Sequence, residues 1–372
     1  MRVAMLNENP AYRSRSFLLV GNDREQGLIH GAQAAPLIRE NLEALKEWID
    51  EEYQSDWNGI NTYLSANETY LKMHQPDLIQ EIEGIAQGSG LPYRDILLMN
   101  LQLYFAMKWI VPECSQFAKT MVDKEGNTRT FTMKTRDNGL GPKENIVLKR
   151  VYPDGLKMIE IGFAGIVTGP GNGINSRGVS LTSSGVWSKK LPVDAGMFAK
   201  GEILPNTHRI LREMRTVDDL GIYLDREPRA SGMNYIAASS GTISSYEVQW
   251  NGYVRTDGRD QVVLTNHYTS EKLQHLSKGF EEYASTHYRH ARITELLPGV
   301  VDPITGWQLM SDHDHFPQNS ICRHNTGEGD GIAQTTYGAF CDVEQQTMYV
   351  GLHQPCMSSM GRFYETGVFE EF

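Results

Sequence analysis

Several features that would place this chain in a common class are missing from its sequence. No stretch approaches the roughly 20 apolar residues of a membrane-spanning helix. Residues 1–10 hold no apolar run behind a basic segment, so no signal peptide is predicted. Basic residues are outnumbered by acidic ones, and the formal net charge is −11. This charge disfavours binding to nucleic-acid phosphates or anionic lipid. We therefore expect a cytoplasmic protein whose partners include neither nucleic acid nor a membrane.

Cysteine is scarce as well. The 372 residues include four cysteines, and no two of them stand at the spacing of metal ligands: Cys114, Cys322, Cys341 and Cys356. A chain of this length does not need disulfides for stability, so free thiols in a reducing compartment are the simplest interpretation. His313 and His315 alternate in a short polar stretch, but a solvated loop explains two such residues better than a metal site does. The sequence predicts no metal and no other cofactor.

The pattern of secondary structure changes near residue 113. Before it, apolar residues recur at helical spacing over 35–53 and 76–87, and again after Pro92. After it, short β-prone runs dominate, with two helices over 208–223 and 271–297. The β-prone runs cover 145–151, 157–163, 178–182, 235–238, 244–250, 261–264, 335–342 and 347–352. This order predicts an α+β fold in which helices pack against antiparallel sheet.

A β-hairpin is predicted at the start of the second part. The β-prone runs 115–122 and 128–135 flank the turn residues 123–127, which include Gly126. If the hairpin is centred on the pair Glu125-Gly126, Cys114 lies directly opposite Asp137. Opposed side chains are roughly 5 Å apart, so this register brings a thiol and a carboxylate together at the open end of the hairpin.

Cys114 follows Pro112 and Glu113 and has two interpretations. A lone cysteine is commonly a small, half-buried apolar side chain. The alternative is a nucleophile, which needs a base and a group that stabilises the oxyanion. No histidine near it in the sequence supports a Cys–His pair, and His267 can be placed beside it only by assuming a fold.

Two later segments contain suitable partners for such a nucleophile. Asn266 follows the strand 261–264, in Leu-Thr-Asn-His, where its amide can donate to a developing oxyanion. Arg323, in Ser-Ile-Cys-Arg, carries a guanidinium that can hold a buried carboxylate such as Asp137 in its charged form. Taken singly, each residue is better explained as a structural hydrogen-bonding group.

Taken together, the residues resemble a known family. Their order along the chain, Cys114, Asp137, Asn266 and Arg323, is similar to that of the acyl-coenzyme A:isopenicillin-N (6-aminopenicillanic acid) acyltransferase family, which belongs to the N-terminal nucleophile hydrolases. Further similar segments lie at 25–31, 173–182, 208–211, 216–219 and 234–238, so the resemblance covers nearly the whole chain.

The resemblance implies a fold and a maturation step. The fold is a four-layer αββα sandwich, two antiparallel sheets between helical layers. The precursor cuts itself before the nucleophile, here between Glu113 and Cys114. The products are a mainly helical fragment 1–113 and a β-rich catalytic fragment 114–372, which stay associated as one structural domain. The cut coincides with the change in composition.

The resemblance also implies a mechanism. Cys114 forms a thioester acyl-enzyme with a small N-acylated amide or a thioester substrate, and an acyl-coenzyme A is one candidate donor. Its freed α-amino group, with a pKa of roughly 7.7–8.0, serves as the base. Asn266 stabilises the oxyanion, Asp137 orients Cys114, and Arg323 fixes Asp137. The expected activity is that of an amidohydrolase or N-acyltransferase acting on linear amide bonds, and the acceptor, water or an amine, stays open.

Two positions depart from the family pattern. Glu113 stands where glycine is common before the nucleophile, and Thr135 replaces the asparagine of Asn-x-Asp. A side chain at 113 restricts the strained backbone that an acyl shift needs. The alternative is therefore an unprocessed relative, either a small-molecule-binding protein or an enzyme that uses Cys114 as an internal thiol nucleophile. A homo-oligomer is compatible with either.

Overall fold

The computed structural model describes residues 15–53, 57–101, 113–139, 143–167, 171–189, 206–227, 232–324, 333–357 and 364–367. The helices are α2 (Asp23–Tyr53), α3 (Trp57–His74), α4 (Pro76–Ser89), α5 (Tyr93–Asn100), α8 (Thr207–Glu213), α9 (Asp219–Arg226), α10 (Ala284–Leu296) and α11 (Pro303–Met310). None of the helices in these ranges is long and apolar enough to cross a membrane.

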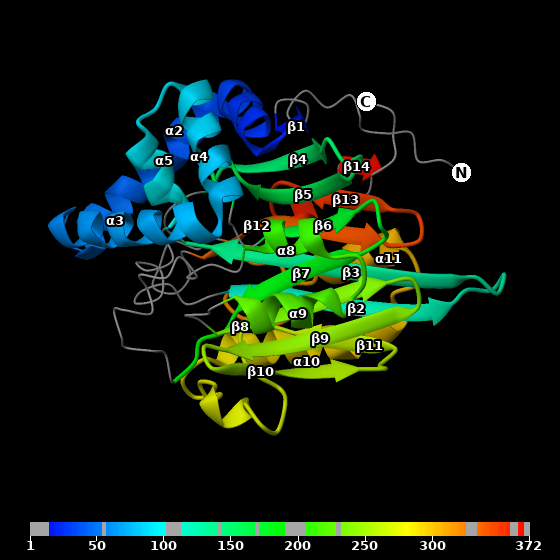
Figure 1. Ribbon diagram of the computed structural model, residues 1–372. Coiled ribbons are helices and arrows are strands. Elements are labelled where there is room, and N and C mark those ends of the chain that lie inside the picture. Colours follow the sequence, from blue (N-terminus) through cyan, green and yellow to red (C-terminus); the bar gives the residue numbers. More distant parts are fainter. Residues whose placement is uncertain are drawn as a thin grey trace.

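The strands form two sheets (Figure 1). The larger has eight strands in the order β1 (Ser16–Val20), β4 (Asn145–Val151), β5 (Lys157–Phe163), β6 (Asn172–Asn175), β7 (Ser180–Gly185), β8 (Met233–Ser239), β9 (Thr242–Gln249) and β10 (Gly252–Asp257). The smaller has six in the order β11 (Gln261–Leu264), β2 (Glu113–Val122), β3 (Thr128–Asn138), β12 (Gln334–Asp342), β13 (Thr347–Gly351) and β14 (Tyr364–Gly367). All pairings are antiparallel except that of β1 with β4.

The side chains alternate along the strands and so build a core on each face of both sheets. In β4, Ile146 and Leu148 pack against the helices α2 to α5, whereas Val147 points to the smaller sheet. The outer face of the smaller sheet packs on α10 and α11, where Phe340 belongs to the same core as Ile293 and Trp307. The molecule is therefore a four-layer αββα sandwich, and the fold class predicted from the sequence is confirmed (Figure 1).

The N-terminal helical layer depends on small residues. The first helix was expected over 35–53, but α2 already begins at Asp23. A Cβ atom on Gly27 would lie 2.2 Å from the backbone oxygen of Glu81, and one on Gly84 would lie 2.3 Å from that of Arg24. Glycine is therefore required where the backbones of α2 and α4 touch, and this contact outweighs the low helix propensity of glycine.

Two other predicted helices have different bounds. The helix expected over 208–223 is two short helices, α8 and α9, because the carboxylate of Asp219 accepts hydrogen bonds from the backbone nitrogens of Arg215 and Thr216 between them. The helix expected over 271–297 is shorter, since α10 begins at Ala284.

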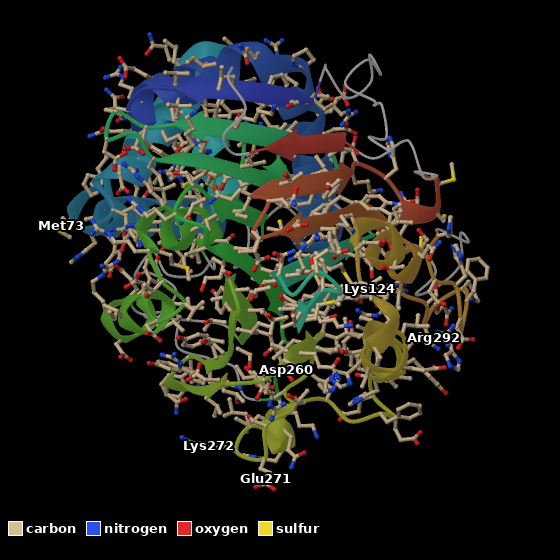
Figure 2. The ribbon with its side chains drawn as sticks, turned by 90° about the vertical axis from the view of Figure 1, so that its right-hand side faces the viewer. Met73, Lys124, Asp260, Glu271, Lys272 and Arg292 are labelled. Atoms are coloured by element: carbon tan, nitrogen blue, oxygen red, sulfur yellow. The ribbon has the colours of Figure 1, made fainter. Side chains whose placement is uncertain are left out.

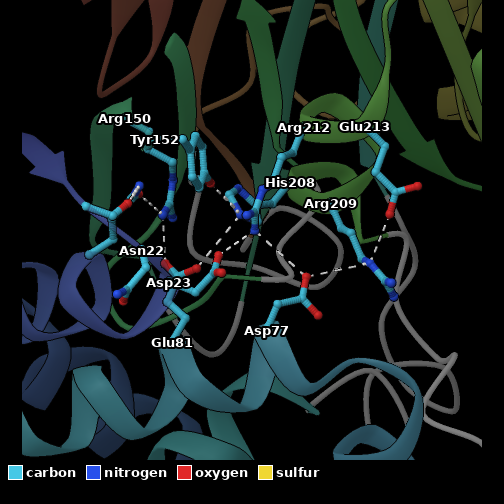
Figure 3. Close-up of polar contacts among 12 residues, drawn as sticks. Asn22, Asp23, Asp77, Glu81, Arg150, Tyr152, His208, Arg209, Arg212 and Glu213 are labelled. Carbon is cyan, nitrogen blue, oxygen red and sulfur yellow. Dashed lines mark hydrogen bonds and ion pairs between the residues drawn. The ribbon is translucent and has the colours of Figure 1, made fainter. Parts of the chain in front are cut away.

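A buried charge network joins the helical layer to the larger sheet (Figure 3). Arg150 of β4 is fully buried and donates to Glu81 of α4 at 2.8 Å and to Glu160 of β5 at 2.6 Å. The imidazole of His208 lies 3.0 Å from Glu160 and 3.1 Å from the hydroxyl of Tyr152. A buried charge that loses its partner typically costs about 3–5 kcal/mol, so this network fixes how α4 and α8 sit on the sheet.

Candidate active site

The hairpin of β2 and β3 sets the position of Cys114, and its register differs from the predicted one. Cys114 pairs with Arg136, and Glu113 pairs with Asp137. The predicted register was centred on the pair Glu125-Gly126, whereas the five-residue turn 123–127 is centred on Glu125 alone. The carboxylate of Asp123 accepts hydrogen bonds from the backbone nitrogens of residues 125 and 127, and Gly126 takes a φ of 86°.

One residue of slip places the predicted pair on opposite faces of the sheet. Gln116, on the same face as Cys114, donates to the backbone oxygen of Asn234 in the larger sheet, so the Cys114 side chain lies between the sheets. Asp137 shares its face with Phe117, which packs on the α10 side. The prediction that Cys114 lies directly opposite Asp137 is therefore wrong.

The backbone of Cys114 is held from two sides. Its amide nitrogen donates to Oδ1 of Asn266 at 2.8 Å, and its carbonyl oxygen accepts from Nη1 of Arg289 at 2.6 Å. Nη2 of Arg289 also donates to Oδ1 of Asn266, at 2.9 Å. The register of β11 against β2, in which Leu264 pairs with Gln116, continues to place Asn266 beside Cys114. The structure thus brings together Cys114 and Asn266, two of the four residues expected at the site.

The amide group of Asn266 faces Cys114 with its oxygen. Its nitrogen, Nδ2, donates to the backbone oxygen of Gly185 at 2.8 Å. An oxyanion needs a donor, so the role predicted for Asn266 requires Nδ2 to exchange this contact for the reacting oxygen.

Arg289 is a site residue that sequence reasoning missed. It lies on α10, is fully buried, and also donates to the hydroxyls of Ser115 and Ser285. The available signal was its place in the helix, because Arg289 falls on the same stripe as the buried Thr286 and Ile293. A charged residue in an apolar stripe indicates a buried polar partner.

Arg323 and Asp137 lie on the α10 side of the hairpin, with Glu113. The guanidinium of Arg323 forms an ion pair with the carboxylate of Glu113, and its charge also acts on Asp137, as the sequence suggested. Asp137 accepts a hydrogen bond from the hydroxyl of Thr335 at 2.6 Å, and the same hydroxyl accepts from the backbone nitrogen of Arg323 at 2.9 Å. Glu113, the departure from the family pattern, thus has its own partner.

The charge of Asp137 depends on these neighbours. Burial raises the pKa of Asp137 to about 6, although the guanidiniums of Arg323 and Arg289 act to lower it. The carboxylate of Glu113 adds to the rise. Loss of Glu113 from this position would therefore favour the ionised form of Asp137.

Lys134 is a second residue that the sequence analysis missed. It lies on β3 and is fully buried, and its amine donates to the backbone oxygen of Ser183 in the larger sheet. The amine also contacts the thiol of Cys114. Burial lowers the pKa of Lys134 to about 8, and the neighbouring Cys114 side chain partly offsets this effect. An amine with such a pKa can accept a proton near neutral pH.

His267, which follows Asn266, takes no part in this arrangement. Its Nδ1 atom lies 2.9 Å from the hydroxyl of Thr286, and its ring packs on those of His287 and His290 at 4.2 and 5.3 Å between centroids. Burial lowers the pKa of His267 to about 3, so the ring is neutral at physiological pH. These contacts make it a structural residue of the β11–α10 junction.

Comparison with known proteins decides the family. The model of the family "Acyl-coenzyme A:6-aminopenicillanic acid acyl-transferase" matches residues 122–356, more than half of the chain. The chain belongs to this family. The match includes Asp137, Asn266, Arg289 and Arg323, and it begins after Cys114. Membership in this family supports an enzyme that transfers an acyl group.

Two solved structures have low similarity to this acyltransferase-family chain. A mutant of the conjugated bile acid hydrolase from Clostridium perfringens is 12% identical, with 69% of this chain and 93% of that chain covered and a TM-score of 0.46. Penicillin V acylase from Agrobacterium tumefaciens is 13% identical, with 64% and 83% covered and a TM-score of 0.39. No curated protein matches significantly.

The raised pKa of Asp137 gives this family member a testable pH dependence. Between about pH 4 and 6 the unfolded carboxyl is ionised while the folded one keeps its proton, so stability from this group is present below pH 4 and is lost as the pH rises through 6. The Asp137→Asn substitution, made in a Cys114→Ala chain so that the chain is not cut after Glu113, should abolish this loss of stability with rising pH. We expect its free energy of unfolding, relative to the Cys114→Ala chain, to rise by up to about 3 kcal/mol from pH 4 to 7.

The measurement is denaturant unfolding at several pH values in that range. Asp154→Asn, at an exposed turn between β4 and β5, is the matched control and should show no such trend. A difference for Asp137→Asn that stays constant with pH contradicts the assignment.

Proposed function

We propose that the chain is a self-processing cysteine amidohydrolase or acyltransferase, with Cys114 as its nucleophile. The observation that carries the proposal is the pair of contacts that hold the Cys114 backbone, from Asn266 to its nitrogen and from Arg289 to its oxygen. A chain that needs only a packed cysteine does not require a buried guanidinium and an amide side chain at one peptide unit.

The first step is self-cleavage, for which the intact chain needs a base other than the α-amine. Lys134 takes the proton of the Cys114 thiol, and the thiolate attacks the carbonyl carbon of Glu113. The carbon–nitrogen bond breaks as Lys134 returns the proton to the Cys114 nitrogen, which leaves a thioester and a free amine. Water then hydrolyses the thioester, giving the new carboxylate of Glu113 and the free thiol of Cys114.

The two products stay together in this scheme. The helices of fragment 1–113 share a core with β4 and β5 of fragment 114–372, and β1 pairs with β4. Burial of apolar surface stabilises by about 25 cal/mol per Å², and this shared core stays buried after a single cut at Glu113. The fragments therefore remain associated.

Cleavage also prepares the site for catalysis. The Cys114 nitrogen becomes an α-amine with a pKa of roughly 7.7–8.0, positioned by Oδ1 of Asn266, and it takes over from Lys134 as the base. Once Glu113 is no longer joined to Cys114, its carboxylate is free to leave Arg323, whose guanidinium then acts on Asp137 alone. The charged carboxylate of Asp137, which pairs with the neighbouring residue Glu113 across the hairpin, stabilises the protonated amine of Cys114.

Turnover then follows the same chemistry on a substrate. The Cys114 thiolate attacks the carbonyl of a small N-acylated amine or a thioester such as an acyl-coenzyme A, and the leaving group takes the proton. Nδ2 of Asn266 moves from Gly185 to the oxyanion, a contact typically worth about 3–4 kcal/mol of barrier. Water or an amine accepts the acyl group from the thioester.

A second candidate function is an enzyme that stays whole and uses Cys114 as an internal thiol, with Lys134 as its lasting base. The ion pair of Glu113 with Arg323 favours this alternative, because it gives the residue before the nucleophile a stable place in the uncut chain. A whole chain that binds a small molecule without turnover would instead be a binding protein.

The intact mass of the denatured protein separates these possibilities. We expect the parent to give two fragments, split between Glu113 and Cys114, and Cys114→Ala to give one chain of 42.0 kDa without activity on amides or thioesters. Cys341→Ala, at a buried thiol in the core between the sheets, is the control and should process as the parent does. A parent that stays whole contradicts self-processing, and activity that survives in Cys114→Ala excludes the thiol mechanism.

The role of Lys134 is tested by Lys134→Met, which keeps the length of the side chain but removes the amine. Loss of a general base typically lowers a reaction rate by about 10²- to 10⁴-fold, so the rate of processing should fall by that factor. The increase of this rate between about pH 6.5 and 8 should also disappear. The rate is read from the appearance of fragments in a pulse-labelled refolding experiment.

Lys119→Met is the matched control for Lys134→Met. Lys119 lies on the neighbouring strand β2 and donates to three backbone oxygens, among them that of Val300, away from the Cys114 side chain. Its processing rate should equal that of the parent. A Lys134→Met chain that folds and processes at the parent rate removes Lys134 from the mechanism.

A further inference from the structure

Four potential metal ligands meet close to Arg323. They are His313, Cys322, His324 and Cys356, and their ligand atoms all lie within 4.8 Å of one another. Three come from the segment after α11, and Cys356 comes from the short turn Pro355–Met357 after β13. From the sequence, His313 was expected in a solvated loop and Cys322 and Cys356 as free thiols, and His324 was not singled out.

The distances within the cluster are close to those of a tetrahedral site. Nε2 of His324 lies 3.0 Å from Nε2 of His313, 3.2 Å from Sγ of Cys356 and 3.9 Å from Sγ of Cys322. Zinc bonds of 2.0–2.1 Å to nitrogen and about 2.3 Å to sulfur place neighbouring ligand atoms roughly 3.3–3.8 Å apart. A small shift of each side chain would therefore seat one ion at the centre.

Hydrogen bonding alone explains this convergence poorly. The Nε2 atom of a neutral imidazole has either one hydrogen or one lone pair, so it makes one good hydrogen bond. His324 directs this single atom at three potential ligands, two of them sulfur, which is a weak hydrogen-bonding atom. A shared cation would satisfy all four groups at once.

We propose that His313, Cys322, His324 and Cys356 bind one zinc ion in a closed tetrahedral site. Two thiolates and two imidazoles are a donor set that zinc prefers, whereas calcium and magnesium prefer oxygen. Binding converts the two thiols to thiolates, so about two protons leave for each ion bound. Four protein ligands leave no open position, and the site is structural rather than catalytic.

The surroundings hold the ligands in place. Arg292 of α10, labelled at the right-hand edge of Figure 2, donates to the carboxylate of Asp312, the residue before His313, at 2.7 Å. The backbone nitrogen of Cys322 donates to the backbone oxygen of Asp312 at 3.0 Å. The indole of Trp307 donates to the backbone oxygen of Pro355 at 3.0 Å, which fixes the turn that carries Cys356.

His315, the other member of the predicted pair, faces elsewhere. Its ring packs on that of Tyr288 at 4.3 Å between centroids. His313 instead meets His324, with their rings 5.1 Å apart. His315 is therefore a matched control for His313, because the two lie on one segment and are both exposed.

The ion would act on the candidate active site through Arg323. Cys322 and His324 flank this residue directly, so zinc fixes the backbone that carries the guanidinium paired with Glu113. It also clamps the turn after β13 to the segment after α11. The inference itself does not depend on the proposed function, because metal binding is measured without a substrate.

The test starts with the full-length protein, purified under reducing conditions without chelator. We expect about one zinc ion per chain by elemental analysis, in the parent and in Cys114→Ala alike. After removal of zinc, cobalt should bind with the charge-transfer absorption of thiolate ligands and release about two protons per ion.

Single substitutions identify the residues that bind the ion. His313→Ala changes an exposed residue and so should fold, yet it should weaken metal binding by more than the roughly 10- to 100-fold that outer-shell changes cost. Cys356→Ser should lose the cobalt–thiolate signal, whereas His315→Ala and Cys341→Ser should keep one zinc per chain. The proposal is overturned by a parent without metal, by a Cys322–Cys356 disulfide that persists in protein purified under reducing conditions, or by zinc that survives His313→Ala and Cys356→Ser unchanged.

Discussion

The guanidinium of Arg289 joins the segments on which the candidate active site depends. It reaches from α10 to the carbonyl of Cys114 on β2 and to the amide oxygen of Asn266 after β11. A buried charge needs partners, and its direct partners are neutral groups, with the carboxylate of Asp137 acting at longer range. Helix, hairpin and loop are thereby held in one arrangement around a single peptide unit.

The charges on the α10 side of the hairpin balance in the intact chain. Two carboxylates, Glu113 and Asp137, face two guanidiniums, Arg289 and Arg323. In our account self-cleavage changes this balance, since it adds an amine at Cys114 and frees Glu113 to move away. The residue that departs from the family pattern thus becomes part of the control of the site, because it holds Arg323 until the chain is cut.

The sequence predicted the fold and part of the site for identifiable reasons. Strand and helix periodicity gave an α+β fold, and the family resemblance gave its two sheets between helical layers. The resemblance also grouped Asn266, just after the strand 261–264, with Cys114, and the pairing of β11 with β2 brings the two residues together. The register of the hairpin was wrong by one residue because it was centred on the pair Glu125-Gly126, whereas the five-residue turn 123–127, closed by the Asp123 carboxylate, is centred on Glu125 alone. Lys134 and Arg289 were missed because a single charged residue in a strand or helix is ordinary until its burial is known. The four residues of the proposed zinc site come from segments that only the folded chain brings together.

The central claim is that the acyl group passes through the thiol of Cys114. The most direct measurement is to mix the protein with a panel of small amides and thioesters, stop the reaction in acid during turnover, and map the acylated peptide by mass spectrometry. The account predicts an acid-stable thioester on the peptide that contains Cys114, formed at the rate of the first turnover. Turnover without acylation of Cys114, or with the acyl group on another residue, would contradict it.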